Sequence, residues 1–273
     1  MAIIDGQQLA QGALARLKQE IDGKHLELQL AAIIIGDNPA LKKFVQLKKK
    51  AAQSIGIEFS AYEIAGDATL ETIKASMKWL SKDPNTQGIL VELPVPEHFN
   101  AQEILNLIDP RKDVDVLTSE KEEGFYKNAL TILPPAVQAL NMVFEKYSIN
   151  PRGKKVAVFG QGRLVGKPIT HWLKSKGAQV FMIDEFTANP EKYSQQAGII
   201  ITGVGKPGLI TADMVKQDAI VIDYGYSLKG GIVAGDVEFK KVAKKASLIT
   251  PVPGGMGPLV IVAVLENLVR LNF

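Results

Sequence analysis

The sequence predicts an α/β protein of two domains, each built on a parallel sheet. Short apolar runs alternate with amphipathic segments along most of the 273 residues, and typical helix-start and helix-stop residues separate them. A charged stretch with few apolar residues, 109–128, divides this alternation into two halves and is expected to cross the surface of the protein. Strands that alternate with helices indicate βαβ units, and a parallel sheet follows from such units.

The first half begins with an apolar run of β-branched character, LQLAAIIIG at 28–36, which predicts a buried strand. Capping residues and a proline at 37–39 are typical of a helix start. This helix is expected to reach Ile55, with Gly56 as its stop. The elements expected next are a strand near 57–64, a helix near 70–80 and a strand at 87–94.

The second half repeats the alternation after a helix expected at 135–147. Its expected strands are the short apolar runs 155–159, 179–183, 198–202 and 219–223. Such a series predicts a Rossmann-like domain, and a last helix from Leu259 is expected to return to the first domain. The expected limits are 1–134, completed by 257–273, for the N-terminal catalytic domain and 135–256 for the Rossmann-like domain.

Composition excludes several classes of function. The 32 basic and 29 acidic residues leave a net charge of +3, which is too small and too scattered to indicate a nucleic acid or a membrane as partner. The chain has no cysteine, which excludes disulfides, and its three histidines are too far apart in sequence to predict a metal site. A signal-peptide core is not evident, and apolar runs fall short of the roughly 20 residues that a membrane span needs. We expect a cytoplasmic protein.

A glycine-rich turn, Gly160 to Gly166, follows one expected strand and opens a helix. Backbone N–H groups and the helix dipole favour a pyrophosphate at such a place. The turn has one residue more than the usual dinucleotide fingerprint, so a turn without a ligand is an alternative. Asp184 and Glu185 end the next strand, near the spacing at which an acidic residue binds the adenosine ribose. Two carboxylates would repel a 2′-phosphate, which favours NAD over NADP.

Two further features indicate a substrate site. Steps of three and four residues back from Ile55 place Lys48 on the apolar stripe of its helix. A lysine there either extends to the surface or serves a cleft, where its ammonium could bind or polarise a substrate. The loop from Thr250 to Pro258 has three prolines and three glycines, a composition that is both stiff and open. It fits a tight turn or a surface for a flat ligand.

Six segments carry a resemblance to a known family: ALKKFVQLKKKAAQSIGI, QGILVELPVP, PRKDVDV, VFGQGRLVGKP, TGVGKPGLI and ITPVPGGMGP. In order and spacing they resemble the methylenetetrahydrofolate dehydrogenase/methenyltetrahydrofolate cyclohydrolase family over nearly the whole chain. The resemblance implies oxidation of 5,10-methylenetetrahydrofolate with NAD or NADP, then hydrolysis of the methenyl product to 10-formyltetrahydrofolate. It also implies a homodimer, a folate substrate and a place in one-carbon metabolism and purine biosynthesis.

The resemblance also implies site residues. The family's catalytic lysine falls on Lys48 and its pterin-binding aspartate on Asp115, while Glu92 stands where the family has glutamine; these three are the expected catalytic residues. The expected substrate-binding residues are Phe44, Lys48, Val91, Glu92, Leu93, Asp115, Pro253, Gly254 and Gly255. The expected cofactor-binding residues are Gly160, Gln161, Gly162, Arg163, Val165, Asp184, Glu185, Gly203 and Tyr226.

Departures from the family leave alternatives open. Phe44 replaces a tyrosine, Val116 replaces a glycine, and Glu92 would hold Lys48 charged more firmly than an amide could. One alternative is therefore a dehydrogenase with weak or absent cyclohydrolase activity, although Glu92 could itself act as a base. Another is a folate- or dinucleotide-binding protein without catalysis, which the retained Lys48 and Asp115 disfavour.

Overall fold

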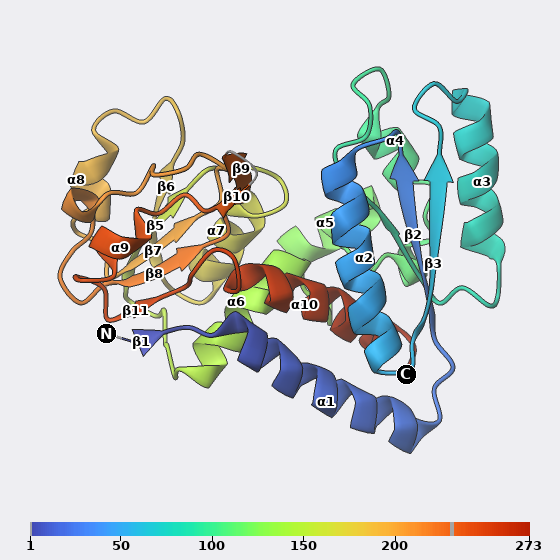
Figure 1. Cartoon of the computed structure of the whole chain (residues 1–273), viewed down its shortest axis with the longest axis horizontal. Coiled ribbons are helices and arrows are strands. Elements are labelled where there is room, and N and C mark those ends of the chain that lie inside the picture. Colours follow the sequence, from blue (N-terminus) through green and yellow to red (C-terminus); the bar gives the residue numbers. More distant parts are fainter. Residues whose placement is uncertain (1, 230–231) are drawn as a thin grey trace. The chain divides into compact units, whose positions relative to one another are not determined.

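The computed structural model describes residues 2–229 and 232–273, which form two compact units (Figure 1). Unit 1 contains the chain up to Ala10 and Ala136–Val260; unit 2 contains Gln11–Pro135 and Ile261–Phe273. Two long helices, α1 (Gly6–Lys24) and α10 (Met256–Leu271), each begin in unit 1 and end in unit 2. The chain up to Ala10 therefore lies outside the unit to which the expected limits 1–134 assigned it.

The remaining elements of unit 2 are β2 (Gln29–Ile35), α2 (Pro39–Ser54), β3 (Glu58–Ile64), α3 (Leu70–Lys82), β4 (Gly88–Val91), α4 (Ala101–Leu105), the 3₁₀ turn η1 (Pro110–Lys112) and α5 (Ser119–Tyr126). Those of unit 1 are β1 (Ala2–Ile3), α6 (Pro135–Lys146), β5 (Lys155–Phe159), α7 (Gly166–Ser175), β6 (Gln179–Ile183), α8 (Pro190–Ser194), β7 (Ile199–Thr202), the 3₁₀ turn η2 (Ala212–Met214), β8 (Ile220–Asp223), β9 (Ser227–Lys229), β10 (Ile232–Ala234), α9 (Phe239–Val242) and β11 (Leu248–Ile249).

The sheet of unit 2 is parallel, in the order β3-β2-β4, which confirms the expected βαβαβ arrangement. In this sheet β3 lies on one side of the central strand β2, and β4 lies on its other side. The connections through α2 and α3 therefore run in opposite directions, so the two helices cover opposite faces of the sheet (Figure 1). Helices on both faces explain why β2 is almost entirely buried and why its sequence is continuously apolar. Gly88 lies against Leu268 of α10, where an added Cβ would come within 2.6 Å of the leucine side chain.

The signals at both ends of α2 act as the sequence predicts. The Asn38 side chain accepts hydrogen bonds from the backbone N–H groups of Ala40 (2.9 Å) and Leu41 (3.4 Å), and Pro39 occupies the first turn. At the other end Gly56 has a φ of +84°, a conformation that glycine adopts at little cost. These two ends fix the position of every side chain on the helix, including Lys48.

The expectation of an exposed crossing at 109–128 is wrong for part of that segment. Asp113, Val114, Val116 and Leu117 are buried, and α5 within it also buries Phe125. An aspartate in a charged stretch of sequence is expected to be exposed, because carboxylates are rarely buried unless they are hydrogen-bonded or paired. Here the partners of the Asp113 carboxylate are backbone N–H groups, which the sequence does not reveal.

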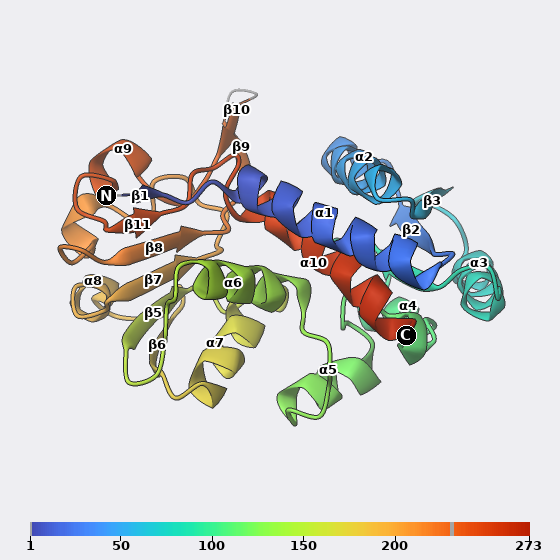
Figure 2. The same cartoon turned by 90° about the horizontal axis from the view of Figure 1, so that it is seen from below.

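The six-stranded sheet of unit 1 is also parallel, in the order β1-β11-β8-β7-β5-β6 (Figure 2). From β5 the chain continues to β6, on one side of β5, and from β6 it crosses to β7, on the other side of β5. The carboxyl ends of β5 and β7 therefore form a topological switch point, where α/β proteins bind their ligands. The expected Rossmann-like order is confirmed, and α10 starts at Met256, three residues before the predicted Leu259.

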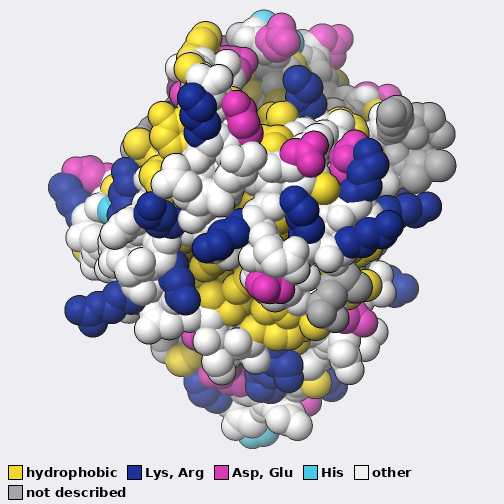
Figure 3. Space-filling view, turned by 90° about the vertical axis from the view of Figure 1, so that its left-hand side faces the viewer, with side chains coloured by type: hydrophobic (Ala, Val, Ile, Leu, Met, Phe, Trp, Pro, Cys, Tyr) yellow, Lys and Arg dark blue, Asp and Glu magenta, His cyan; other side chains and the backbone are white. Residues whose placement is uncertain are grey.

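Charged side chains are mixed with other types on the face of the molecule that Figure 3 shows. On the face shown in Figure 3, lysine and arginine side chains lie among acidic, uncharged and hydrophobic ones. Of the helices that the structure describes, none combines the length and the apolar character that a membrane span requires. Among the same residues, no cluster of three or more histidine or acidic side chains is arranged to hold a metal ion.

Candidate active site

Lys48 and Glu92 form a buried ion pair in unit 2. The Nζ of Lys48 lies 2.6 Å from Oε1 of Glu92, and their side chains are only 13% and 7% exposed. Lys48 comes from α2, and Glu92 directly follows β4, where its backbone N–H donates to the carbonyl of Ile33. The lysine on the apolar stripe thus contacts a carboxylate at the carboxyl edge of the sheet.

Asp115 interacts electrostatically with this pair. Burial raises the pKa of Asp115 to about 7; the Lys48 ammonium lowers it, while the Glu92 and Asp113 carboxylates raise it further. A carboxyl group with this pKa exchanges a proton near neutral pH. The structure therefore brings together all three residues that were expected to be catalytic, as one cation and two carboxyl groups.

A tight turn presents Asp115. The buried Asp113 carboxylate accepts hydrogen bonds from the backbone N–H groups of Asp115 (3.1 Å), Leu117 (2.9 Å) and Thr118 (2.7 Å). Inside this turn Val116 has a φ of +60°, a conformation that a β-branched residue adopts only under strain. The valine stands where the family resemblance predicts glycine. Three hydrogen bonds to one carboxylate hold the strained residue in place.

The other expected substrate-binding residues have different surroundings. Phe44 is half-buried, one helical turn before Lys48 on α2. The side chain of Val91 is buried in the hydrophobic core of unit 2, whereas that of Leu93 packs against this core and is only partly buried.

Pro253, Gly254 and Gly255 lie in unit 1, on the loop between β11 and α10. Gly254 has a φ of +96°, and a Cβ on Gly255 would lie 2.4 Å from the carbonyl oxygen of Pro251. Gly6, at the start of α1, packs against the same loop: its Cβ would lie 1.8 Å from the carbonyl oxygen of Gly255. This loop requires glycine for its backbone geometry.

The glycine-rich turn of unit 1 forms a close backbone cradle at the switch point. Gly160 has a φ of +83°, and a Cβ on Gly166 would lie 1.7 Å from the Gly160 carbonyl oxygen. A Cβ on Gly203, in the loop after β7, would lie 2.8 Å from the Val165 side chain. A valine precedes α7, and its side chain has no group that could accept a hydrogen bond from the first turn. The N-terminus of α7 is thus suited to an anion such as a pyrophosphate.

Asp184 and Glu185 are exposed at the end of β6, the strand beside β5. Oδ1 of Asp184 accepts hydrogen bonds from the Phe186 N–H (3.1 Å) and the Thr187 hydroxyl (2.8 Å), so part of this carboxylate shapes its own turn. Of the other expected cofactor residues, Gln161 donates to the carbonyl of Val158 (3.1 Å). Gly162 lies open on the same turn, whereas Arg163 and Tyr226 are half-buried.

Sequence reasoning missed three buried aspartates, Asp113, Asp223 and Asp236. All three accept hydrogen bonds from backbone N–H groups of loops. Asp223 ends an apolar run and is followed two residues later by Gly225, and Gly235 directly precedes Asp236. An aspartate beside a glycine at the end of an apolar run was the sequence signal that could have indicated these buried carboxylates. Burial raises the pKa of Asp223 to about 6.

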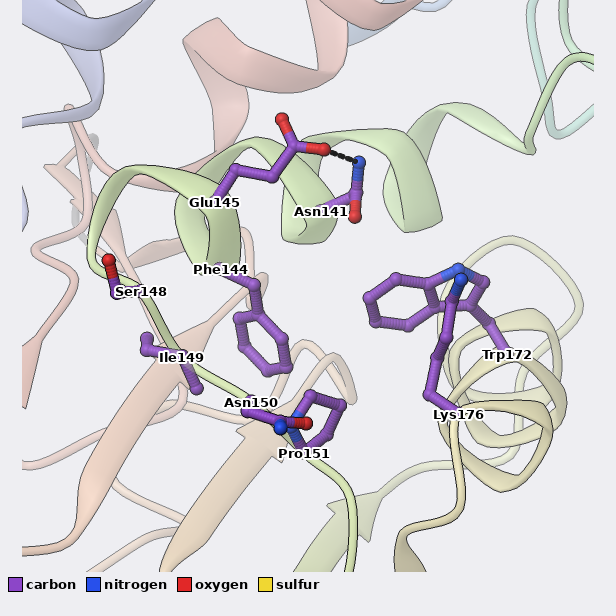
Figure 4. A pocket seen from close by; sticks show the side chains of 9 residues that line it. All are labelled: Asn141, Phe144, Glu145, Ser148, Ile149, Asn150, Pro151, Trp172 and Lys176. Atoms are coloured by element: carbon purple, nitrogen blue, oxygen red, sulfur yellow. Dashed lines mark hydrogen bonds between the residues drawn. The ribbon is translucent and has the colours of Figure 1, made fainter.

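A separate hollow in unit 1 lies away from these groups, between the end of α6 and α7 (Figure 4). Its volume is about 340 Å³, and Phe144 and Trp172 form much of its apolar wall. Asn141 and Glu145 hydrogen-bond to each other at its rim (2.8 Å). The residues expected to bind substrate or cofactor do not line it.

Comparison with known proteins gives matches along nearly the whole chain. Residues 4–115 match the model of the catalytic domain of tetrahydrofolate dehydrogenase/cyclohydrolase, and residues 134–272 match its NAD(P)-binding domain. The bifunctional protein FolD of Nautilia profundicola is 39% identical over 274 residues, which cover 99% of this chain and 96% of that protein.

Solved structures agree. The bifunctional enzyme FolD of Campylobacter jejuni, a methylenetetrahydrofolate dehydrogenase/cyclohydrolase, has a TM-score of 0.95 at 35% identity, with 99% of this chain and 98% of that chain covered. The Trypanosoma brucei enzyme, complexed with NADP and an inhibitor, has a TM-score of 0.94 at 27% identity, with 99% and 96% covered.

The strained conformation of Val116 can be tested by stability. Glycine normally makes a protein less stable than alanine, by about 0.5–1 kcal/mol, but a left-handed φ penalises alanine by about 1–2 kcal/mol. We expect Val116→Gly to be at least as stable as Val116→Ala, measured as the free energy of unfolding in urea. Val114, also buried but without a positive φ, provides the control: Val114→Gly should be less stable than Val114→Ala. The same order at both positions would contradict the interpretation.

Proposed function

The chain belongs to the tetrahydrofolate dehydrogenase/cyclohydrolase family, and from this premise we propose how its own residues perform the two reactions. It oxidises 5,10-methylenetetrahydrofolate with a nicotinamide dinucleotide and hydrolyses the methenyl product to 10-formyltetrahydrofolate. The observation that carries the proposal is the buried Lys48–Glu92 pair beside Asp115. One assay tests it: purified protein with methylenetetrahydrofolate and each dinucleotide, following the methenyl and formyl products separately.

The oxidation requires mainly alignment from the protein. A nicotinamide dinucleotide bound in unit 1 would supply the hydride acceptor for the methylene carbon, and the folate cation that results would be shared by two nitrogens. The residues of unit 1 fit such a cofactor, because Gly160, Gly166 and Gly203 let the glycine-rich turn and the loop after β7 pack closely, where added side chains would clash. In this proposal they bind the pyrophosphate at the start of α7, and Asp184 and Glu185 bind the adenosine ribose.

The hydrolysis requires a proton carrier. Water adds to the methenyl carbon and loses one proton, which leaves a hydroxyl group on that carbon. One carbon–nitrogen bond of the adduct then breaks: that nitrogen gains a proton, and the hydroxyl loses its proton and becomes the formyl oxygen. Lys48 is the group we assign to stabilise the adduct and to exchange its proton, with Glu92 holding the ammonium in position. Asp115 binds the pterin ring, and its pKa of about 7 allows it to donate or accept a proton near neutral pH.

Three finer points belong to the same proposal. NAD is preferred to NADP, because two exposed carboxylates follow β6 where a 2′-phosphate would lie. The protein acts as a homodimer, as the family resemblance implies, and it acts in the cytoplasm, as we expect from its sequence. The predicted domain roles also remain a proposal, with folate chemistry in the N-terminal catalytic domain and dinucleotide binding in the Rossmann-like domain.

Replacement of Lys48 separates chemistry from stability. Lys48→Met should slow hydrolysis on the order of 100-fold, because the proton carrier is lost. It should also lower the unfolding free energy, since the Glu92 carboxylate stays buried without its cation. Lys48→Met/Glu92→Gln should recover stability but not hydrolysis. Lys50→Met, at an exposed position of the same helix, is the control. Hydrolysis at the parent rate in Lys48→Met would remove the lysine from the mechanism.

Glu92→Gln should shift the pH profile of hydrolysis. The Glu92 carboxylate raises the pKa of Asp115, so its removal lowers that pKa, and the apparent pKa in the rate profile should fall. With Phe44→Tyr added, the family pair is restored, and hydrolysis should rise more than oxidation. Single variants are needed because neighbouring sites couple. Glu58→Gln, an exposed carboxylate on β3, should leave the profile unchanged. Slower hydrolysis after Glu92→Gln would instead identify Glu92 as a working base.

The cofactor preference can be measured directly. The ratio of kcat/KM for NAD to that for NADP should exceed one in the parent. In Asp184→Asn/Glu185→Gln it should fall about tenfold, since two like charges near the 2′-phosphate are removed. The asparagine retains the oxygen that accepts from the Phe186 N–H. Asp213→Asn, at another exposed site of unit 1, is the matched control. A parent that prefers NADP would indicate that a basic group, with Arg163 as the first to test, reaches the phosphate.

A further inference from the structure

Two buried aspartates of unit 1 take no part in the chemistry proposed above. Asp223 ends β8 and is 3% exposed, whereas Asp236 follows β10 and is fully buried. Carboxylates are rarely buried without strong hydrogen bonding, because their desolvation is costly. The groups that bond to them therefore indicate what they do.

Asp236 fixes the loop that follows β7. Its Oδ2 accepts hydrogen bonds from the Thr202 hydroxyl and the Val204 N–H, both at 2.7 Å. Its Oδ1 accepts from the Lys206 N–H, also at 2.7 Å. One carboxylate thus joins the end of β7 to two points of the loop 203–206. The same loop carries Gly203, which packs closely against the glycine-rich turn.

Asp223 in turn holds Asp236. Its Oδ1 accepts from the N–H groups of Gly225 (2.7 Å) and Asp236 (3.2 Å), and its Oδ2 accepts from the Val237 N–H (3.0 Å). Its own backbone N–H donates to the Thr250 hydroxyl at the end of β11 (2.7 Å). With a pKa of about 6, Asp223 is ionised at neutral pH and acts only as an acceptor.

Two glycines make room for the carboxylates. A Cβ on Gly225 would lie 2.3 Å from Oδ1 of Asp236, and a Cβ on Gly235 would lie 2.2 Å from Oδ2 of Asp223. Side chains at these positions would displace the carboxylates from their donors. The sequence therefore commits four positions to one hydrogen-bonded arrangement at the carboxyl edge of the sheet.

We propose that Asp236, held by Asp223, is a positioning residue that fixes loop 203–206 in the conformation that binds the dinucleotide. The inference rests on the proposed function, because the dinucleotide is the ligand for this edge of the sheet. A loop that is ordered before binding does not have to be ordered by the ligand, which strengthens binding. Asp236 acts through the loop backbone and does not itself need to contact the cofactor.

The experiment compares Asp236→Asn with Thr202→Val. In Asp236→Asn an NH₂ group replaces one carboxylate oxygen, and it cannot accept a hydrogen bond from a loop N–H group. Thr202→Val removes only the hydroxyl that donates to Asp236 and leaves the bonds from the Val204 and Lys206 N–H groups intact. Calorimetric titration with NAD and with NADP should show Kd rising about tenfold in Asp236→Asn and staying within twofold of the parent in Thr202→Val. Hydrolysis of methenyltetrahydrofolate, assayed without dinucleotide, should stay within twofold in both. Both variants should unfold at lower temperature.

Three results would overturn the proposal: unchanged dinucleotide binding in Asp236→Asn, equal weakening in Thr202→Val, or a loss of hydrolysis that parallels the loss of binding. The last would indicate general destabilisation. If Asp236→Asn does not fold, Gly225→Ala displaces the same carboxylate and should raise Kd in the same way. A parent that binds dinucleotide but does not oxidise methylenetetrahydrofolate would contradict the proposed function and leave this comparison interpretable.

Discussion

The Lys48 ammonium and the Glu92 carboxylate lie 2.6 Å apart and almost out of contact with water, so the loss of either would leave the other buried without its partner. The pair joins α2 to the end of β4, so the register of the helix and the position of the strand depend on each other. The pair also acts on Asp115: the Lys48 ammonium lowers the pKa of that carboxyl group, and the Glu92 carboxylate raises it. The acidity of that carboxyl is therefore a property of three elements of unit 2 acting together.

Local patterns in the sequence predict much of the fold. Continuous apolar runs marked β2 and β4 because helices cover both faces of their sheet, and capping residues marked α2. Lys48 could be identified from helical spacing alone, since a charged residue on an apolar stripe needs a buried partner or a cleft. Helix α1 gave a weaker pattern, because two of its four buried hydrophobic side chains are the small residues Ala10 and Ala13.

The remaining features depend on partners that are remote in sequence or that belong to the backbone. Asp113 and Asp236 look like surface residues until their N–H donors are known. β1 and β11, of two residues each, are too short to have a pattern, and they are defined by pairing: β1 with β11, and β11 also with β8. The resemblance to a family predicted Lys48, Glu92 and Asp115 as a set, and their geometry fits the roles proposed for them.

The contact between Gly6 and Gly255 has a consequence for handling the protein. Because β1 pairs with β11, and α1 begins against the loop 251–255, the first residues of the chain are part of unit 1. A fragment that starts at residue 136 would leave one side of β11 as an open sheet edge and remove the support beneath its glycine loop. Excision of unit 1 for separate expression therefore needs a circularly permuted or linked design, in which the N-terminal strand is carried along with the Rossmann-like sheet.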